Sequence, residues 1–165
     1  NWSEGFLGRV FVLRLEEGEI FNDTLETFAR DRAIERGLVF LLGGAGAGSR
    51  MVVGPTAARP VAVEVESPNE QGPLSSEAAT IVPLLHVLAA PHEVMAVGTL
   101  FPGPDRRPVL HLHAAAGREG DAVVGCTRAG TATWLVAEAV ILEIVGTTAE
   151  RRLDPTTGFE LLRAG

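Results

Sequence analysis

The sequence predicts a single α/β (α+β) domain built on a largely antiparallel sheet, and three observations support this class. Its 165 residues suffice for one domain with a real core but fall short of the usual size of two. Several segments alternate apolar and polar residues with the two-residue period of strands, and short turns join them. One segment, residues 22–36, has the apolar spacing of a main helix.

The first predicted strand covers residues 8–15 and alternates apolar side chains between its two faces. After a turn, Asn22 or Asp23 would cap the helix, and Glu26 stands where it would complete a capping box with Asp23. Gly37 would end this helix, because glycine accepts the left-handed conformation common after the last helical turn.

Residues 38–42 form a short apolar strand that runs into a glycine-rich segment, residues 43–48. Dinucleotide- and phosphate-binding loops also follow a strand, but they need a helix N-terminus directly after the glycines. Here residues 49–55 are typical of another strand, and no Gly-Lys-Ser/Thr occurs. The segment therefore predicts a bulged, tightly bent strand rather than a nucleotide site.

The middle of the chain predicts a strand, a loop and an ambiguous segment. Residues 60–66 alternate valine with glutamate, as in a half-buried strand of an antiparallel sheet. Residues 67–76 are rich in Pro, Gly and Ser and predict a loop. Residues 78–88 are apolar but contain a proline, so both a short helix and a strand are possible, and His86 within them is expected to pack in the core.

Residues 133–146 are mostly apolar and β-branched, which predicts a long strand covered on both sides by a helix or a partner chain. Glu138 and Glu143 interrupt it, and a buried carboxylate is costly unless it is paired or binds a metal. Glu138 would be a general base or a partner of a metal-bound histidine, or such a glutamate would sit on an exposed edge or pair with an arginine such as Arg50 or Arg152. The chain then ends in a turn and a short apolar segment that packs back on the fold.

A possible metal site lies on the strand that begins at Pro108. His111 and His113 are two residues apart, so their imidazoles point to the same face. If Ala115 pairs with Ala122 across a hairpin, Cys126 lies opposite His111 on that face. Two imidazoles and a thiolate would then hold Zn²⁺ or another divalent metal, with a fourth position open. The same spacing also fits two solvated histidines and a small buried cysteine.

The preceding strand, residues 94–101, would lie beside this site. If Phe101 pairs with Pro108, Gly98 and Ala96 lie opposite the two histidines and leave space for a pocket or for another subunit. His92 would then lie well beyond the histidine pair along the sheet. It could join the metal ligands only if the chain before residue 94 folds back, so it is a secondary candidate.

Composition excludes several classes of function. The formal net charge of -7 makes the chain a poor partner for nucleic acid, because phosphate binding depends on Lys and Arg. A single cysteine excludes an internal disulfide and fits a reducing, cytoplasmic compartment. No apolar run approaches the about 18 residues of a membrane span. The N-terminal residues also lack the basic and apolar regions of a signal peptide.

The order of these motifs resembles a known family. Its members share a turn before the helix, paired glycines after the second strand, an H-x-H strand and a late Asp-Pro-Thr-Thr-Gly. The matching segments here are Arg14–Glu19, Gly44–Gly46, Gly98–Gly103, His111–Ala114, Val124–Cys126, Ala137–Ile141 and Asp154–Gly158. Together they resemble the PPC domain of plants and prokaryotes, over about residues 10–162.

The resemblance implies a compact α/β fold with a largely antiparallel mixed sheet, one main helix and short helices, and a homotrimer. For some prokaryotic members it implies a metal near the paired histidines. Many members carry histidine where this chain has Cys126, and a thiolate can replace an imidazole on zinc. The plant proteins bind DNA through an AT-hook, which this chain lacks, so their DNA binding is not carried over.

The expectation is one PPC-like domain over residues 1–165, acting as a trimeric binding or assembly module that holds a divalent metal at His111, His113 and Cys126. One alternative is a metal-dependent enzyme on a small molecule, in which a metal-bound water reacts and Glu138 or Glu93 moves the proton. The second alternative is a DNA-associated regulatory protein, which the charge disfavours.

Overall fold

The computed structural model describes residues 1–56, 82–155 and 157–165. The strand predicted at residues 60–66, the loop predicted at 67–76 and the start of the ambiguous segment lie outside the described residues. Within them, eight strands form one sheet in the order β1-β8-β2-β5-β6-β7-β3-β4, and all neighbouring pairs are antiparallel. Strands β9 and β10 form a separate antiparallel pair.

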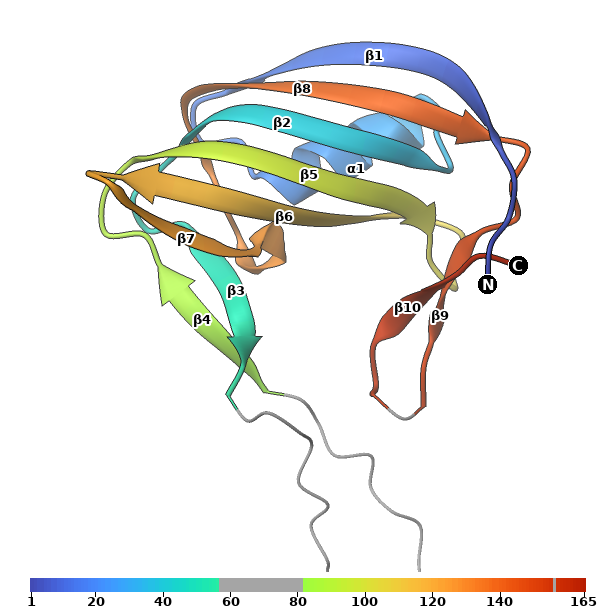
Figure 1. Ribbon diagram of the computed structural model, residues 1–165. Helices are drawn as coiled ribbons and strands as arrows, with labels where there is room; N and C mark the ends of the chain where they lie inside the picture. Colours follow the sequence, from blue (N-terminus) through green and yellow to red (C-terminus); the bar gives the residue numbers. More distant parts are fainter. Residues whose placement is uncertain (57–81, 156) are drawn as a thin grey trace, which may run out of the picture.

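The bounds of the elements follow the chain from the N-terminus to the C-terminus (Figure 1). They are β1 (Phe6–Glu16), α1 (Phe21–Asp31), β2 (Gly37–Ala45), β3 (Arg50–Pro55), β4 (Pro83–Val87), β5 (His92–Pro102), β6 (Pro108–Arg118), β7 (Asp121–Cys126), a 3₁₀ turn η1 (Thr127–Ala129), β8 (Thr133–Val145), β9 (Glu150–Leu153) and β10 (Glu160–Arg163). The predicted class, a large antiparallel sheet with one main helix, is confirmed.

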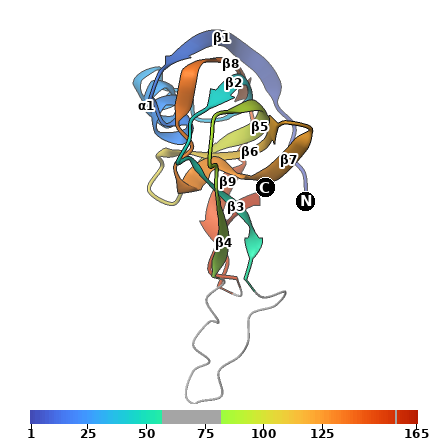
Figure 2. The same ribbon diagram turned by 90° about the vertical axis from the view of Figure 1, so that its left-hand side faces the viewer.

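Helix α1 covers one face of the large sheet, as Figures 1 and 2 show from two directions. Phe21, Leu25 and Ala29 of α1 are fully buried against inward-facing strand residues. Those residues alternate along each strand, as in Leu110, Leu112 and Ala114 of β6. On the opposite face, called the open face below, β9 approaches β5 at Thr99, while apolar residues such as Val12 and Phe40 stay exposed.

The predicted helix ends are wrong. The residue before the helix is Ile20, which makes no side-chain cap, and α1 ends at Asp31, so Gly37 instead begins β2. Asn22 lies inside the helix, where its Nδ2 donates to the carbonyl of Leu110 at 3.0 Å. Glu26 accepts from the amide of Leu110 at 2.7 Å.

The side chains of Asn22 and Glu26 bind unpaired backbone groups at the edge of β6. Strand β7 pairs with β6 only from His113 onward, so the edge groups of Leu110 would otherwise be buried without partners. Such unpaired backbone groups are costly, and two polar side chains of α1 satisfy them. Burial raises the pKa of the Glu26 carboxyl, and its hydrogen bond from Leu110 opposes that shift. Asn22 and Glu26 therefore bind the sheet rather than cap the helix.

The glycine-rich segment is a bulged strand, as predicted. The pairing of β2 with β8 shifts register between Gly43 and Gly44. A Cβ at Gly43 would lie 2.5 Å from the Cα of Ala137, and its φ of +149° is also unfavourable for other residues. A Cβ at Gly44 would lie 2.6 Å from the carbonyl oxygen of Trp134. The glycines therefore allow β8 to approach closely.

Two smaller predictions are corrected in the peripheral segments. Residues 83–87 of the ambiguous segment are strand β4, and His86 is exposed on it rather than packed in the core. Strand β4 lies at the edge of the sheet and pairs only with β3, so α1 does not cover it. The C-terminal residues form the β9–β10 hairpin, in which Leu161 and Leu162 stay exposed.

Glu143 is the buried carboxylate of β8, and Arg9 pairs with it. The Arg9 Nη2 and Nε atoms donate to the two carboxylate oxygens at 2.6 and 2.7 Å. A Cβ at Gly8 would lie 2.7 Å from this carboxylate, so the glycine provides its space. The Arg9 hydrogen bonds hold the pKa of Glu143 below its ordinary value near 4.5. The sequence suggested Arg50 or Arg152 as the ion-pair partner of a glutamate in this strand, whereas the partner of Glu143 is Arg9.

Replacing Glu143 with glutamine is expected to destabilise the protein in a pH-dependent way. Because folding lowers this pKa, the charged pair stabilises the fold above about pH 4.5, and this contribution is lost as the pH falls through the folded-state value. The variant should melt about 2–4 °C or more below the parent at pH 7, with a smaller difference at pH 3.5. Thermal melts at both pH values measure this, with E93Q as an exposed control on β5. A difference that is constant with pH would contradict the ion-pair account.

Candidate metal site

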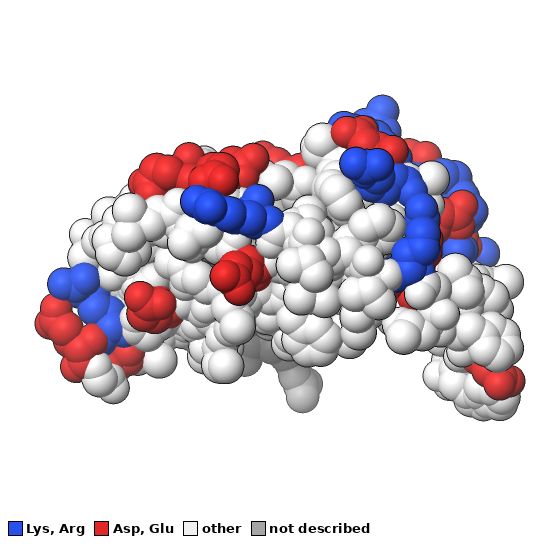
Figure 3. All heavy atoms as spheres, turned by 90° about the horizontal axis from the view of Figure 1, so that it is seen from above, with Lys and Arg blue, Asp and Glu red and all other residues white. Residues whose placement is uncertain are grey.

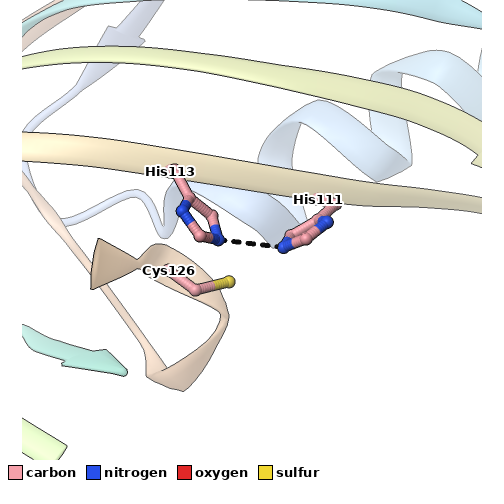
Figure 4. A group of neighbouring side chains, drawn as sticks. All are labelled: His111, His113 and Cys126. Atoms are coloured by element: carbon pink, nitrogen blue, oxygen red, sulfur yellow. Dashed lines mark hydrogen bonds between the residues drawn. The ribbon is translucent and has the colours of Figure 1, made fainter. Parts of the chain in front are cut away.

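His111, His113 and Cys126 come together at the edge of β6 where β7 ends, as Figure 4 shows. The Nε2 atoms of the two imidazoles are 3.0 Å apart. All three donor atoms, including Sγ of Cys126, lie within 4.8 Å of one another. His113 is exposed, His111 is half-buried and Cys126 is buried. Among the described residues, this is the group of His, Cys, Asp or Glu whose atoms are close enough to share a metal.

The pairing of β6 with β7 differs from the prediction by two residues. Ala122 pairs with Gly117 and not with Ala115, so Cys126 lies opposite His113 and not opposite His111. The hairpin turn is shorter than predicted because β6 continues through Arg118. A shift of two residues keeps every side chain on its face, since strand side chains alternate with period two. The three ligands therefore still share one face.

The pairing of β6 with β5 differs from the prediction by one residue, which reverses the faces. Phe101 pairs with Val109, so Thr99 lies opposite His111 and Val97 lies opposite His113. The small residues Gly98 and Ala96 instead face the core. A Cβ at Gly98 would lie 2.6 Å from the carbonyl oxygen of His111, so the absence of a side chain serves close packing. The predicted space above the histidines is not formed by these two residues.

The donor set fits zinc. In a tetrahedral site with Zn–N bonds of about 2.0–2.1 Å, two nitrogen ligands lie about 3.3 Å apart. The observed separation of 3.0 Å between the imidazole nitrogens is close to this value. Small side-chain rotations would bring Sγ within range of the same ion. Two imidazoles and a thiolate are ligands that zinc accepts, and three protein ligands leave a fourth position open.

Burial lowers the pKa of His111 to about 4, and the positive charges of Arg128, His113 and Arg151 add to the effect. The imidazole is therefore neutral at pH 7, which is the protonation state that binds a metal. No carboxylate belongs to this cluster among the described residues, so none offsets the effect of burial on His111.

Two arginines next to the ligands were missed by sequence reasoning. The Nε of Arg128 in η1 donates to Sγ of Cys126 at 3.2 Å. Arg151 of β9 is buried, and its Nη2 donates to the hydroxyl and the carbonyl of Thr99 at 3.1 and 3.3 Å. Arg128 could have been suspected from its place two residues after the cysteine. Nothing in the local sequence around Arg151 indicates that β9 returns to this site.

The other candidate residues lie away from the cluster. His92 begins β5 and pairs with Ala45, and its Nδ1 is 2.7 Å from the carbonyl oxygen of Ala90. Glu138 is exposed on β8, which is separated from β6 by β2 and β5. At about 4.8 Å per strand, it lies about 14 Å from β6 and does not reach the candidate metal ligands of its own chain. Glu93 pairs with Gly117, about 13 Å along β6 from His113 at about 3.3 Å per residue.

A row of side chains crosses the open face and ends at the candidate metal ligands. Strand register aligns Val12, Val140, Phe40, Val97, His113 and Cys126. Val12, Phe40 and Val97 are 79%, 45% and 50% exposed, and Leu42 and Met95 in the next row are also exposed. Single exposed apolar residues are ordinary, but contiguous ones on one sheet face mark an interaction surface. In the described part of the chain, no helix is long and apolar enough to cross a membrane.

Comparison with known proteins agrees with this fold. A metal-containing protein from Archaeoglobus fulgidus is 21% identical, with a TM-score of 0.71 over 96% of this chain and 95% of its own. A plant- and prokaryote-conserved protein from Pyrococcus horikoshii is 19% identical, with a TM-score of 0.69 over 96% and 94%. A candidate DNA-binding protein from Ralstonia eutropha is 15% identical, with a TM-score of 0.63 over 92% and 89%. Among curated proteins, none matches the sequence.

These similarities to solved structures, all below 25% identity, establish the fold alone. Sequence comparison is more specific, because the family model for the Plants and Prokaryotes Conserved domain matches residues 3–145, most of the chain. That match includes β6, β7 and the three clustered ligands. The resemblance inferred from the H-x-H strand and its neighbouring motifs is thereby confirmed, and the chain belongs to the Plants and Prokaryotes Conserved (PPC) domain family.

Proposed function

We propose that this chain is a self-associating PPC-domain binding module that holds one divalent metal, zinc by preference, at His111, His113 and Cys126. The observation that carries the proposal is the convergence of two imidazole nitrogens and one thiol sulfur within 4.8 Å. The half-buried imidazole, neutral at pH 7, and the open fourth position suit a site that binds a ligand through the metal. The metal-containing relative from Archaeoglobus fulgidus supports the same assignment.

Elemental analysis tests this assignment. The protein should be purified without a histidine tag or chelator and should contain about one zinc per chain. After removal of the metal, added zinc should raise the melting temperature, because an ion that binds only the folded state stabilises it. Protein that contains no metal, and whose melting temperature does not respond to added zinc, would overturn the proposal.

Self-association through the open face is the second part of the proposal, with the homotrimer of the family resemblance as the expected assembly. The exposed apolar rows of β1, β8, β2 and β5 support it, because a second copy would remove them from water. Light scattering after size-exclusion chromatography measures the mass directly. A monomer at micromolar concentration would contradict this part and leave the metal assignment standing.

A metal-dependent hydrolytic reaction is the alternative activity of this site. Zinc would lower the pKa of a bound water, but a proton acceptor would also be needed within hydrogen-bond reach. Glu138 and Glu93 of the same chain are both more than about 10 Å away along the sheet. The arrangement therefore favours ligand binding over catalysis, unless a second copy supplies the base.

DNA association is less well supported. The net charge is -7, and acidic and basic side chains are interspersed on the face seen in Figure 3, without a continuous basic patch. Phosphate binding by proteins depends on such a patch. A salt-sensitive mobility shift with duplex DNA near 0.15 M salt would support this alternative.

A further inference from the structure

We propose that Arg128 and Arg151 form, beside the three metal ligands, a subsite for a small oxyanion, a carboxylate or a phosphate, which occupies the open position of the metal. This inference rests on the proposed metal site and names the class of ligand that the site would take.

Arg151 is 5% exposed, yet its hydrogen bonds are incomplete. Its Nη2 is held by the hydroxyl and carbonyl oxygens of Thr99. Its Nε is buried without a hydrogen-bond partner, the one such side-chain atom found in the described residues. A buried guanidinium donor without an acceptor is costly, and buried polar groups almost always have partners. The unpaired donor therefore indicates a missing acceptor, which an oxyanion would supply.

Thr99 places the Arg151 guanidinium beside the metal ligands. Thr99 and His111 are directly opposed across β5 and β6, so their side chains share the open face with Cβ atoms about 4.5–5.5 Å apart. The guanidinium that binds the Thr99 hydroxyl is thus a neighbour of the His111 imidazole. Its positive charge also lowers the pKa of His111.

Arg128 contacts the same cluster at Cys126. Its Nε donates to Sγ of Cys126, which leaves its two terminal amino groups free of any hydrogen bond within the described residues. Neither Arg128 nor Arg151 makes an ion pair within 4.0 Å there, whereas Arg9, Arg36, Arg106 and Arg152 each do. Glu26 and Glu160 influence Arg151 only from a longer distance. The two arginines therefore keep donors for an external anion.

The sum of charges favours an anion over a neutral ligand. A divalent metal and two guanidinium groups outweigh the single thiolate, because both imidazoles are neutral ligands. Arginine also binds carboxylate and phosphate oxygens through charge-assisted hydrogen bonds, which are stronger than neutral ones. One oxygen of the ligand would bind the metal, and the others would accept from the arginines.

Cobalt-loaded protein provides the test, because Co²⁺ in a thiolate-containing tetrahedral site absorbs visible light and responds to a change of its fourth ligand. Sodium phosphate, sodium acetate and neutral acetamide are titrated separately into the parent and into R128Q. We expect phosphate or acetate to change the spectrum saturably, and acetamide to have no effect. Loss of one charge-assisted partner should weaken the oxyanion at least about tenfold in R128Q.

Arg152→Gln is the matched control, since it removes the same charge from the next residue of β9. Its side chain is 68% exposed and pairs with Glu150, and neighbouring strand residues point to opposite faces. R152Q should bind oxyanions as the parent does.

R151K keeps the charge of Arg151 without its planar fork, and it should also weaken oxyanion binding. R128Q is the decisive variant, because Arg128 is exposed and its replacement leaves the core intact.

The possible outcomes separate the two proposals. If cobalt binds and neither anion changes the spectrum, or if R128Q and R152Q bind oxyanions as the parent does, the oxyanion subsite is overturned and the metal site stands. If cobalt and zinc do not bind at all, the proposed function fails and the subsite fails with it. Saturation by acetate alone would identify a carboxylate ligand, and saturation by phosphate alone would identify a phosphate.

Discussion

Replacing Cys126 with serine is expected to weaken zinc binding by more than about 100-fold, which exceeds the effect of losing a residue that only supports a ligand. A serine hydroxyl is nearly the same size but remains protonated near pH 7, so the site loses its only anionic ligand. His113→Ala should weaken binding to a similar extent, and because His113 is exposed its loss does not disturb the core. Competition with a chromophoric chelator measures both affinities.

Two measurements distinguish the loss of a metal ligand from misfolding of the variants. The metal-free melting temperatures of C126S and H113A should stay within a few degrees of the parent, while the rise on adding zinc should disappear. His92→Ala is the control among the histidines, since His92 lies at the far end of β5. Parent-like zinc affinity in C126S, or an equal loss in H92A, would show that the metal binds elsewhere.

The fold was predictable where local pattern decides it. Alternation along residues 8–15, the apolar and β-branched run 133–146, and the helical spacing after Asn22 identified β1, β8 and α1. The helix cap was not predictable, because Asn22 and Glu26 bind Leu110, which is more than 80 residues away in the sequence. Capping rules consider only residues that are close in the sequence, so they cannot predict such a tertiary contact.

The sequence predicted that the three candidate ligands share one face of the sheet, but it did not predict how their strands pair. His111 and His113 are two positions apart, so both face the same side. Cys126 also faces that side, because the observed pairing of β6 with β7 differs from the assumed one by an even number of residues, two. The pairing of β6 with β5 differs from the assumed one by one residue, which reverses the faces of the strand residues. The histidines therefore lie opposite Thr99 and Val97 rather than opposite the small residues Gly98 and Ala96. Arg151 could not be foreseen, since only the tertiary fold brings β9 to β5.

Replacing Phe40 with glutamate is expected to convert the proposed trimer into a monomer. Phe40 lies in the middle of the apolar row, with Val140 on one neighbouring strand and Val97 on the other. A carboxylate there would have to be buried without a partner on association, which costs several kcal/mol or more. In the separate chain the same side chain is 45% exposed, so the glutamate stays in water and the fold should survive.

Light scattering should show a threefold fall in mass for F40E, with an unchanged circular dichroism spectrum. Thr27→Glu is the control, because Thr27 is exposed on α1 and the added charge lies on the helix side of the sheet. A trimeric F40E would exclude the open face as the interface. Because all three proposed metal ligands come from one chain, monomeric F40E should keep its zinc affinity within about threefold, less than 1 kcal/mol. A larger loss would mean that a neighbouring copy completes the metal site.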